Sequence, residues 1–426
     1  MTPRLLAYNL LLKAEKYNQY SNIILDNALT DSGMSNPDRR LASTLFYGVI
    51  EKKLTLDYQI ANLSQRPINK LDIEVLTALR LGIYQLAFLD RIPAHAAINE
   101  TVNLCSKKVS GFVNAVLRSY TRCDGIALPE KDDTVKYLSV SYSVCEPIVE
   151  KFLSVFGEEE TEKLLGAFTV CTDTTIRVNT LKISRDTIAK KLDNPVKTKH
   201  SPSGLYVHGS VRGFYGFDNG LFFVQDQASQ ICTEVLGAKE NDVVIDVCSC
   251  PGSKSFGAAI DMNNKGKIYS FDLHENKLSL VRSSAERLGI DIIETAAHDG
   301  RVLIPELQGQ ADKVICDVPC SGFGVLGKKP EIRYKDPEFS KNLPNIQSAI
   351  LNNACNYVKE GGVLVYSTCT LLPEENEEII KAFLSTHDDF SLCSWQVGEI
   401  CSDGMLTLLP HVHGTDGFFI AKLIRN

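Results

Sequence analysis

Several features that would assign this chain to a special class are missing. No apolar run approaches the roughly 18 residues that a membrane-spanning helix needs. The first residues lack a signal-peptide cleavage pattern, and the chain holds no internal repeat and no low-complexity tract. Its 426 residues, 44% hydrophobic and 23% charged, can bury a large core over roughly two to four domains. We therefore expect a cytoplasmic, globular protein with no membrane partner, and a monomer by default.

Cysteine pairs with the spacing of metal ligands are also absent. None of the 13 cysteines belongs to a Cys-x-x-Cys pair, which argues against zinc fingers and ribbons. An odd number of cysteines in a long chain argues against a small disulfide-bonded scaffold. We expect no metal site, and we expect most of the thiols to be small core residues.

An excess of positive charge is missing too. The net charge of −7 counts against a protein that binds nucleic acid through bulk charge alone. The charge is uneven, because residues 1–140 hold 17 Lys and Arg against 14 Asp and Glu, a balance of +3, so the remainder carries −10. Any contact with RNA would therefore be made by local patches.

The spacing of apolar residues changes along the chain. Residues 1–125 repeat apolar positions at three- and four-residue steps and predict a helical bundle, followed by a linker over 126–140. Residues 141–234 mix strand and helix patterns and predict a small α+β module. From 235 to 426 short apolar strands alternate with helices, which predicts a doubly wound, parallel α/β sheet. The expected strands lie at 243–247, 267–271, 312–317 and 362–366, and the expected helices at 275–288 and 343–358.

The loop after the first of these strands is a candidate ligand site, because such sheets bind ligands beyond the carboxyl ends of their strands. Its small residues and its glycine let backbone N–H groups approach a nucleotide-like ligand. The pattern is neither Gly-x-Gly-x-x-Gly nor Gly-x-x-x-x-Gly-Lys-Ser/Thr, so a dinucleotide or a triphosphate is not favoured. An ordinary strand-to-helix turn is the alternative. The loop consists of Cys248, Ser249, Cys250, Pro251, Gly252, Ser253 and Lys254.

Two aspartates follow later strands. Asp272 ends the second strand, where a carboxylate can accept hydrogen bonds from ribose hydroxyl groups. Asp299 could serve an adenine amino group in a similar way. For both residues the structural alternative is a turn or a helix cap.

Two cysteines also follow strand ends. Cys320 stands in DVPCSG after Asp317, and Cys369 stands in YSTCT. They would face the same crevice if their strands are neighbours. Two buried structural thiols are the alternative, but an ionised carboxylate beside Cys320 in a crevice favours a functional role. Glu374, Glu375 and Glu377 stand where a helix opens, and the structural alternative for them is that they simply complement its dipole.

Two thiols, one carboxylate and a nucleoside-sized cofactor pocket suit the alkylation of carbon 5 of a pyrimidine. That carbon is a poor nucleophile until a thiolate adds at C6 and makes it enamine-like. A carboxyl group at N3 would help the ring to accept the negative charge. After the transfer the C5 proton must leave and the thiol must be eliminated, which needs a base.

The motifs DVCSCPGSKS, DVPCSGFG and YSTCTLLPEENE resemble the signatures of the Sun/Fmu family of RNA 5-methylcytosine methyltransferases. RVNTLK, FVQDQAS and GTDGFFIAKL are similar to other segments of that family. DRRLASTLFYGVIEKKLTLD, LRLGIYQLAFLDRIPAHAAINETV and GFVNAVLR resemble the NusB-like domain that is fused ahead of the catalytic part in its bacterial 16S ribosomal RNA subgroup. The resemblance therefore spans nearly the whole chain.

The resemblance implies a fold and a reaction. The fold is a Rossmann-like S-adenosylmethionine-dependent methyltransferase sheet, with an all-α, NusB-like, RNA-binding domain and an RNA-binding α+β module ahead of it. The reaction is methylation of C5 of one cytidine in 16S ribosomal RNA, with the position 967 site as the expected target. Ribosomal RNA would be the partner, and DNA would not.

The resemblance also implies roles for individual residues. Cys369 would be the nucleophile that adds to C6, and Cys320 would assist proton removal and enzyme release. Asp317 would contact the cytosine ring close to the cofactor. S-adenosylmethionine would be bound by the loop 248–254, Asp272, Asp299 and Asp317, with Lys254 as the lysine of the loop. Lys328, Lys329 and Arg333 would lie near the RNA.

The loop departs from the family's usual Cys-Ala-Ala-Pro-Gly-Gly-Lys-Thr. Cys250 and Ser253 replace smaller residues, and Ser253 takes the place of a glycine, which affects how closely backbone and cofactor can approach. No catalytic group is lost. We therefore expect activity, with cofactor affinity as the property that these changes alter.

Other functions stay open at this point. An amino-methyltransferase would carry Asn/Asp-Pro-Pro-Tyr/Phe where this chain reads DVPC. A DNA cytosine-5 enzyme would take its nucleophile from the Pro-Cys motif and leave Cys369 idle. An RNA-binding or antitermination factor would rely on residues 1–120 and keep the sheet as a vestige. A 5-methylcytosine enzyme could also act on another RNA.

Overall fold

The computed structural model describes residues 1–426 except 18–24, 26–27, 30–32, 124, 171–172 and 210. The chain divides into two compact units. The first, the helical unit, comprises residues 1–169 and 328–336, and the second, the sheet unit, comprises 170–327 and 337–426. Within the described ranges, no helix combines the length and the apolar character needed to cross a membrane.

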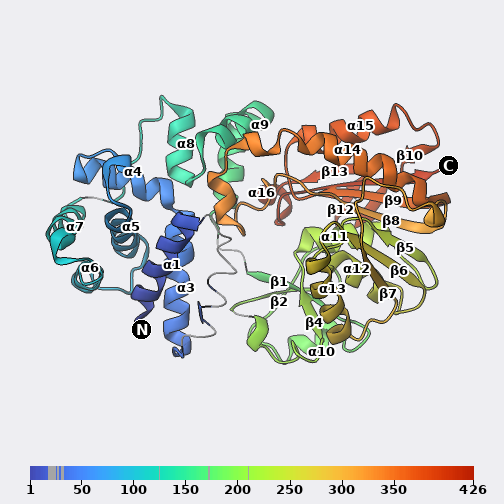
Figure 1. The fold of residues 1–426 in the computed structure, drawn as a ribbon, viewed down its shortest axis with the longest axis horizontal. Coiled ribbons are helices and arrows are strands. Elements are labelled where there is room, and N and C mark those ends of the chain that lie inside the picture. The colour runs from blue at the N-terminus through green and yellow to red at the C-terminus, as the bar shows by residue number, and fades with distance from the viewer. Residues whose placement is uncertain (18–24, 26–27, 30–32, 124, 171–172, 210) are drawn as a thin grey trace. The chain divides into compact units, whose positions relative to one another are not determined.

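The helical unit is a bundle of helices (Figure 1). These helices bury apolar faces against one another. Leu45, Leu79 and Leu117, from three different helices, are fully buried in this core. Local capping sets one helix start, because the Ser35 hydroxyl accepts a hydrogen bond from the backbone N–H of Asp38 at 3.4 Å. The helices are α1 Pro3–Tyr17, α3 Asn36–Glu51, α4 Lys53–Ser64, α5 Ile73–Phe88, α6 Ala94–Val102, α7 Lys107–Tyr120, α8 Thr134–Tyr142 and α9 Glu146–Ala167, with the 3-10 turns η1 Ile68–Lys70 and η4 Pro330–Tyr334.

A short segment from the second half of the chain completes the helical unit. Residues 328–336 leave the sheet unit and pack among these helices. The guanidinium group of Arg333, which is 2% exposed, donates hydrogen bonds to the backbone carbonyls of Tyr142 at 2.9 Å and Phe168 at 2.7 Å. The backbone N–H of Cys145 donates in turn to the Arg333 carbonyl at 2.8 Å. The expectation that Arg333 lies near RNA is wrong, because its donors are used inside the protein.

The helical unit extends further than the expected domain boundary. α8 begins inside the expected linker of 126–140, and α9 occupies most of 141–169, the start of the expected α+β module. The periodicity of α9 is hard to see in the sequence because Gly157, at φ 76°, interrupts the helix and divides its apolar face. Ile148 and Phe152 before this break are fully buried.

The sheet unit is built on an eight-stranded sheet in the order β10-β14-β9-β8-β5-β6-β7, with β13 paired to β14. Strands β5 to β9 run parallel, and β14 is antiparallel to β9. One face packs against α11, α12 and α13, and the other against α14 and α15. The predicted Rossmann-like α/β sheet is confirmed. Its elements are β5 Val243–Asp246, β6 Lys267–Asp272, β7 Ile293–Ala297, β8 Ala311–Asp317, β9 Val358–Thr368, β10 Phe390–Leu392, β13 Met405–Leu408, β14 Phe418–Arg425, α11 Gln227–Leu236, α12 Ser253–Asp261, α13 Glu275–Leu288, α14 Leu343–Ala354, α15 Glu377–Leu384 and α16 Pro410–His413.

A small antiparallel sheet, in the order β2-β3-β1-β4, belongs to the same compact unit as the large one. Arg177 of β1 ties the two together, because its fully buried guanidinium donates to Asp261 at the end of α12 at 2.6 Å. Gly257 leaves room for this group, since a Cβ there would lie 2.6 Å from the guanidinium nitrogen Nη1. The remaining elements are β1 Thr174–Val178, α10 Arg185–Ala189, β2 Val196–Lys197, β3 Gly204–Val207, β4 Phe222–Val224, β11 Trp395–Val397 and β12 Ile400–Ser402.

Candidate active site

The strand order reverses at β5, which lies between β6 and β8. Loops that follow the carboxyl ends of neighbouring parallel strands meet at such a point and form the ligand crevice of open α/β sheets. Asp317 at the end of β8 lies opposite Ser367 of β9 in the strand register. The predicted site segments after β5, β6, β8 and β9 therefore open at one edge of the sheet.

The loop after β5 is fixed by hydrogen bonds from its backbone N–H groups to the end of β6. The N–H of Ser249 donates to the Phe271 carbonyl at 2.7 Å, and the N–H of Cys250 donates to Asp272 Oδ2 at 3.4 Å. Gly252 has φ 106°, and a Cβ there would lie 2.4 Å from Phe256 Cζ. The Ser249 hydroxyl is buried without a hydrogen-bond partner. A glycine cradle with an unused buried hydroxyl fits the binding of a polar cofactor.

Lys254 does not extend into solvent but pairs with Asp317. Its side chain is only 8% exposed, and Nζ lies 2.6 Å from Asp317 Oδ2. The Ser367 hydroxyl donates to Asp317 Oδ1 at 2.7 Å, so both carboxylate oxygens are held. Burial alone would lower the pKa of Lys254, but the Asp317 carboxylate outweighs it and raises the pKa above its usual value. The ammonium group therefore stays charged beside the strand ends.

Asp272 and Asp299 differ in how far their carboxylate oxygens are already hydrogen-bonded within the protein. Asp272 is half-buried and accepts two backbone N–H bonds, from Cys250 and, at 3.1 Å, from His274. A carboxylate in this state keeps lone pairs for further donors such as ribose hydroxyls. Both oxygens of Asp299 are instead bonded to Arg301, with contacts of 2.6 to 3.2 Å, and this hydrogen bonding lowers the pKa of Asp299 to about 2.

The structure brings the two predicted catalytic cysteines together. Their sulfur atoms lie 3.2 Å apart, and the backbone N–H of Cys369 donates to Cys320 Sγ at 3.3 Å. Hydroxyls of the residues that follow them, Ser321 and Thr370, lie 2.7 Å apart. The pKa of Cys320 is raised well above its usual value, first by its hydrogen bond to Cys369 and then by burial. Cys320 therefore keeps its proton at neutral pH.

The two cysteines of the cofactor loop have a different character. Burial, followed by nearby carboxylates, raises the pKa of Cys250 to about 12 and that of Cys248 higher still. A thiol that stays protonated at neutral pH is a weak nucleophile. The two loop cysteines are therefore weak nucleophiles at neutral pH.

Two further polar residues at this edge escaped the sequence prediction. Glu375 was expected to complement a helix dipole, but it is 1% exposed and its carboxylate accepts a hydrogen bond from the Ser321 N–H at 2.9 Å. Gln347 of α14 also donates to this carboxylate, at 2.8 Å. The cluster of acids in PEENE is the only signal for Glu375, and the apolar period of α14 gives none for Gln347.

Other candidate residues lie elsewhere. Lys328 and Lys329 are exposed, as an RNA contact requires, and belong to the helical unit. Among the described residues, no group of three His, Cys, Asp or Glu side chains could hold a metal ion.

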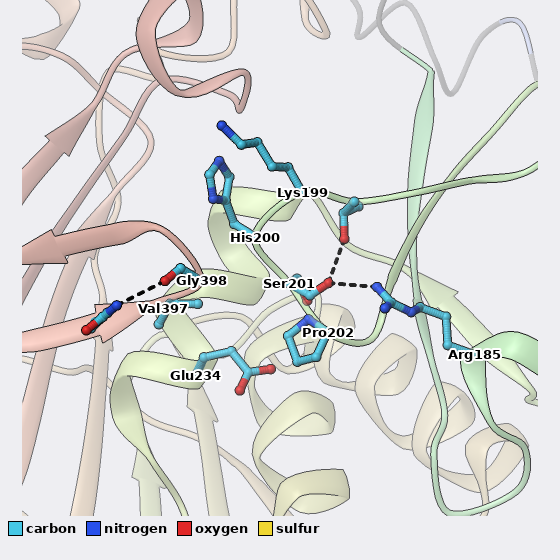
Figure 2. A pocket seen from close by; sticks show the side chains of 10 residues that line it. Arg185, Lys199, His200, Ser201, Pro202, Glu234, Val397 and Gly398 are labelled. Carbon is cyan, nitrogen blue, oxygen red and sulfur yellow. Dashed lines mark hydrogen bonds between the residues drawn. The ribbon is translucent and has the colours of Figure 1, made fainter.

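A cavity of about 400 Å³ lies between the β2–β3 loop and the β11–β12 hairpin (Figure 2). Lys199 and His200 extend to one side of it, and Arg185 donates to the Ser201 carbonyl at 3.2 Å. None of the predicted catalytic or cofactor residues lines it. This cavity is therefore not the candidate active site.

A parallel sheet of this order, a glycine-containing cradle after its first strand and a carboxylate after its second define an S-adenosylmethionine-dependent methyltransferase of the Rossmann-like class. Family models agree: 16S rRNA methyltransferase RsmB/F matches residues 233–424, and the NusB family matches 1–122. The chain belongs to the RsmB/F methyltransferase family and carries a NusB-like domain at its amino-terminal end.

Individual relatives match over nearly the whole chain. "Probable ribosomal RNA small subunit methyltransferase B" of Bacillus subtilis (strain 168) is 35% identical, covering 98% of this chain and 97% of the relative. "Ribosomal RNA small subunit methyltransferase B" of Escherichia coli O1:K1 / APEC is 31% identical, covering 92% of each. Among solved structures, PH0851 matches with a TM-score of 0.82 and 26% identity over 99% of both chains. NSun6 from Pyrococcus horikoshii matches with a TM-score of 0.60 and 25% identity over 66% of this chain and 98% of its own.

Proposed function

We propose that this enzyme methylates C5 of a cytidine in small-subunit ribosomal RNA through a transient bond between the Cys369 sulfur and C6 of the base. The observation that carries the proposal is the pair of thiols 3.2 Å apart beside the Lys254–Asp317 ion pair. An amino-methyltransferase has no use for two adjacent thiols. The relatives named above support ribosomal RNA as the substrate.

The geometry suggests which residue takes part in each step of the reaction. Cys369, as the thiolate, adds to C6, and Lys254 and Asp317 lie where they can contact the polar edge of the ring as charge develops on it. Bound S-adenosylmethionine supplies the methyl group that C5 takes up. A base then removes the C5 proton, and the C5–H electron pair forms the C5=C6 double bond while the C6–S bond breaks and its electrons return to Cys369. Cys320, next to the leaving sulfur, assists this release.

The loop 248–254 and Asp272 are proposed to bind the cofactor. The unused Ser249 hydroxyl and the free lone pairs of Asp272 provide the polar contacts that a methionine and a ribose moiety need. Asp299 can take part only through oxygens that already accept from Arg301. We therefore expect Asp272 to contribute more to cofactor affinity than Asp299 does.

The test uses RNA that contains 5-fluorocytosine, which has no C5 proton to lose and so keeps the adduct. Wild-type enzyme should form an adduct that survives a denaturing gel, and Cys369→Ala should form none, should methylate nothing and should still bind RNA. Cys320→Ala should instead remain attached to RNA with ordinary cytidine, because attack proceeds and release stalls. The exposed Cys401 provides the control, Cys401→Ala, which should behave as wild type. An adduct formed through Cys320, or methylation by the Cys369 variant, would refute this assignment.

The reacting thiol also distinguishes the alternatives. A DNA cytosine-5 enzyme of the usual kind would attack through Cys320 and act on DNA. A binding factor with a vestigial sheet would neither bind S-adenosylmethionine nor form an adduct. Bisulfite sequencing of ribosomal RNA from a deletion strain would identify the cytidine, and an unchanged 16S pattern would show that another RNA is the substrate.

We propose that the helical unit contributes RNA affinity. Lys107 and Lys108 are exposed in the first turn of α7 and can contact phosphates. The double variant Lys107→Ala/Lys108→Ala should weaken RNA binding. It should also make the slope of the logarithm of the binding constant against the logarithm of salt concentration less steep by about 1.5. Deleting residues before 135 is a poorer test, because it removes helices against which residues 328–336 pack. An unchanged salt slope would contradict the proposal.

A further inference from the structure

A buried carboxylate connects the two cysteine loops without taking part in the proposed chemical steps. Glu375 is 1% exposed and ends the 3-10 turn η7 (Pro373–Glu375), six residues after Cys369. Burying a carboxylate is costly unless hydrogen-bond donors meet it. The donors that it meets therefore show what its position achieves.

These donors connect Glu375 to the residues on both sides of Cys320. Glu375 Oε2 accepts from the backbone N–H of Ser321, the residue after Cys320, at 2.9 Å. It also accepts from Gln347 Nε2 at 2.8 Å, and the same amide nitrogen donates to the carbonyl of Pro319, the residue before Cys320, at 3.0 Å. One carboxylate and one amide thus hold the backbone immediately before and after the Cys320 thiol.

The charge of this group acts on Cys320 as well. Glu375 Oε1 is buried with no hydrogen-bond partner, and burial raises the pKa of this carboxyl group, whereas the hydrogen bonds from Ser321 and Gln347 to Oε2 favour its charged form. The titratable groups that face Cys320 are the Cys369 thiol, the Tyr366 phenol and the Glu375 carboxyl group. After the hydrogen bond to Cys369 and burial, the negative charge of Glu375 is a further cause of the raised pKa of Cys320. A sulfur with a raised pKa keeps its proton at rest and is a stronger base once it has lost it.

We propose that Glu375 is a positioning residue that fixes Cys320 for the release of methylated RNA and leaves Cys369 as the sulfur that attacks. Glu375 touches neither the base nor the cofactor in this account. It acts by holding the Pro319–Ser321 backbone and by keeping a negative charge beside the Cys320 thiol. The inference rests on the proposed function, because release matters only where an adduct forms.

The first measurement is the fate of the adduct in Glu375→Gln, a variant that keeps the shape and removes the charge. With RNA that contains ordinary cytidine, adduct formation in the first turnover should match wild type. Release should be at least about 10-fold slower, so that protein–RNA adduct accumulates on denaturing gels as turnover continues. The control is Glu378→Gln, the same chemical change at an exposed position on α15, which should turn over as wild type does.

The second measurement is the pH profile of Cys320 alkylation by iodoacetamide, read peptide by peptide by mass spectrometry in the full-length protein. Removing the Glu375 charge should move the midpoint for Cys320 to lower pH by at least about half a unit. Gln347→Met keeps the charge and removes the bridging amide, so it should slow release and leave the midpoint near its wild-type value. A purely structural role for Glu375 would not produce this separation.

Each outcome decides the inference. Release at the wild-type rate in Glu375→Gln, with an unchanged alkylation midpoint, would overturn it. If Glu375→Gln does not fold, Gln347→Met decides, and wild-type release in that variant would overturn the positioning role. Failure of wild-type enzyme to form an adduct with 5-fluorocytosine RNA would instead reject the proposed function itself. An adduct in the wild type and no effect in either variant would reject only the role of Glu375.

Discussion

Asp246, at the end of β5, offers a quantitative test of the electrostatics of the strand ends. It is 1% exposed, Oδ2 accepts from the Ser255 hydroxyl at 2.7 Å, and Oδ1 has no hydrogen-bond partner. Burial is the largest cause of a rise in its pKa from 3.8 to about 7. Hydrogen bonding from the Ser255 hydroxyl and the Cys248 backbone, together with the nearby Lys254 ammonium, does not compensate for the loss of water.

The sign of the effect on stability follows from where the proton binds. Between about pH 4 and pH 7 the folded protein holds a proton on Asp246 that the unfolded chain has released. The stability contributed by the protonated form is therefore fully present below about pH 4 and is lost as the pH rises to about 7. A shift of about three units corresponds to about 4 kcal/mol in all. Asp246→Asn mimics the protonated form at every pH.

The variant should therefore become more stable relative to wild type as the pH rises, by about 3 kcal/mol between pH 5 and pH 8. The assay is guanidinium unfolding without cofactor, followed by fluorescence. Trp395, the single tryptophan of the chain, is 6% exposed and lies in the sheet unit, so it reports on the unit that contains Asp246. Other buried acids contribute equally to the pH dependence of the unfolding free energy in both proteins, so their contributions cancel when the variant is compared with wild type. Parallel pH profiles for wild type and Asp246→Asn would refute the reasoning.

Three further outcomes are expected. Arg177→Leu leaves Asp261 without its 2.6 Å partner and should destabilise the sheet unit by about 3 kcal/mol in the Trp395 assay, and a loss below about 1 kcal/mol would contradict this. Gly252→Ala places a Cβ against the Phe256 ring at a backbone φ of 106°, which strains the loop. The variant should therefore bind S-adenosylmethionine more weakly when affinity is measured by calorimetry. Unchanged affinity would show that the loop relaxes around the added methyl group. Arg301→Ala removes the partner of Asp299 and should raise the pKa of that carboxyl group from about 2 toward its usual value in an NMR titration, whereas an unmoved pKa would mean that other donors hold it.

The helical unit gives a structural reason to treat the chain as one enzyme. Residues 328–336 follow the Cys320 loop by only a few residues, yet they belong to the helical unit. Within that unit Tyr334 donates to the Ile50 carbonyl at 2.5 Å and Arg333 is buried. Removing the amino-terminal helices would therefore leave these side chains without their partners.

The sequence alone determined the sheet and the chemical groups at its edge. Strands of the parallel sheet are short apolar runs, and their ends are marked by Asp272, Asp317 and the two cysteines, so local pattern and sequence position suffice. Helix α13 agrees with its expected bounds because its apolar period is regular. The family motifs added the roles expected of Cys369 and Cys320.

Only the tertiary structure decided which of these side chains contact one another and which already have hydrogen-bond partners inside the protein. Glu375 and Arg333 look like ordinary surface charges in the sequence, because their hydrogen-bond partners are distant in the chain: the Ser321 N–H is 54 residues from Glu375, and the Phe168 carbonyl is 165 residues from Arg333. The pairing of Lys254 with Asp317 and the 3.2 Å approach of the two thiols likewise depend on strand order. Burial and long-range contact set the charge and availability of a side chain, and neither is a property of the residues next to it in the chain.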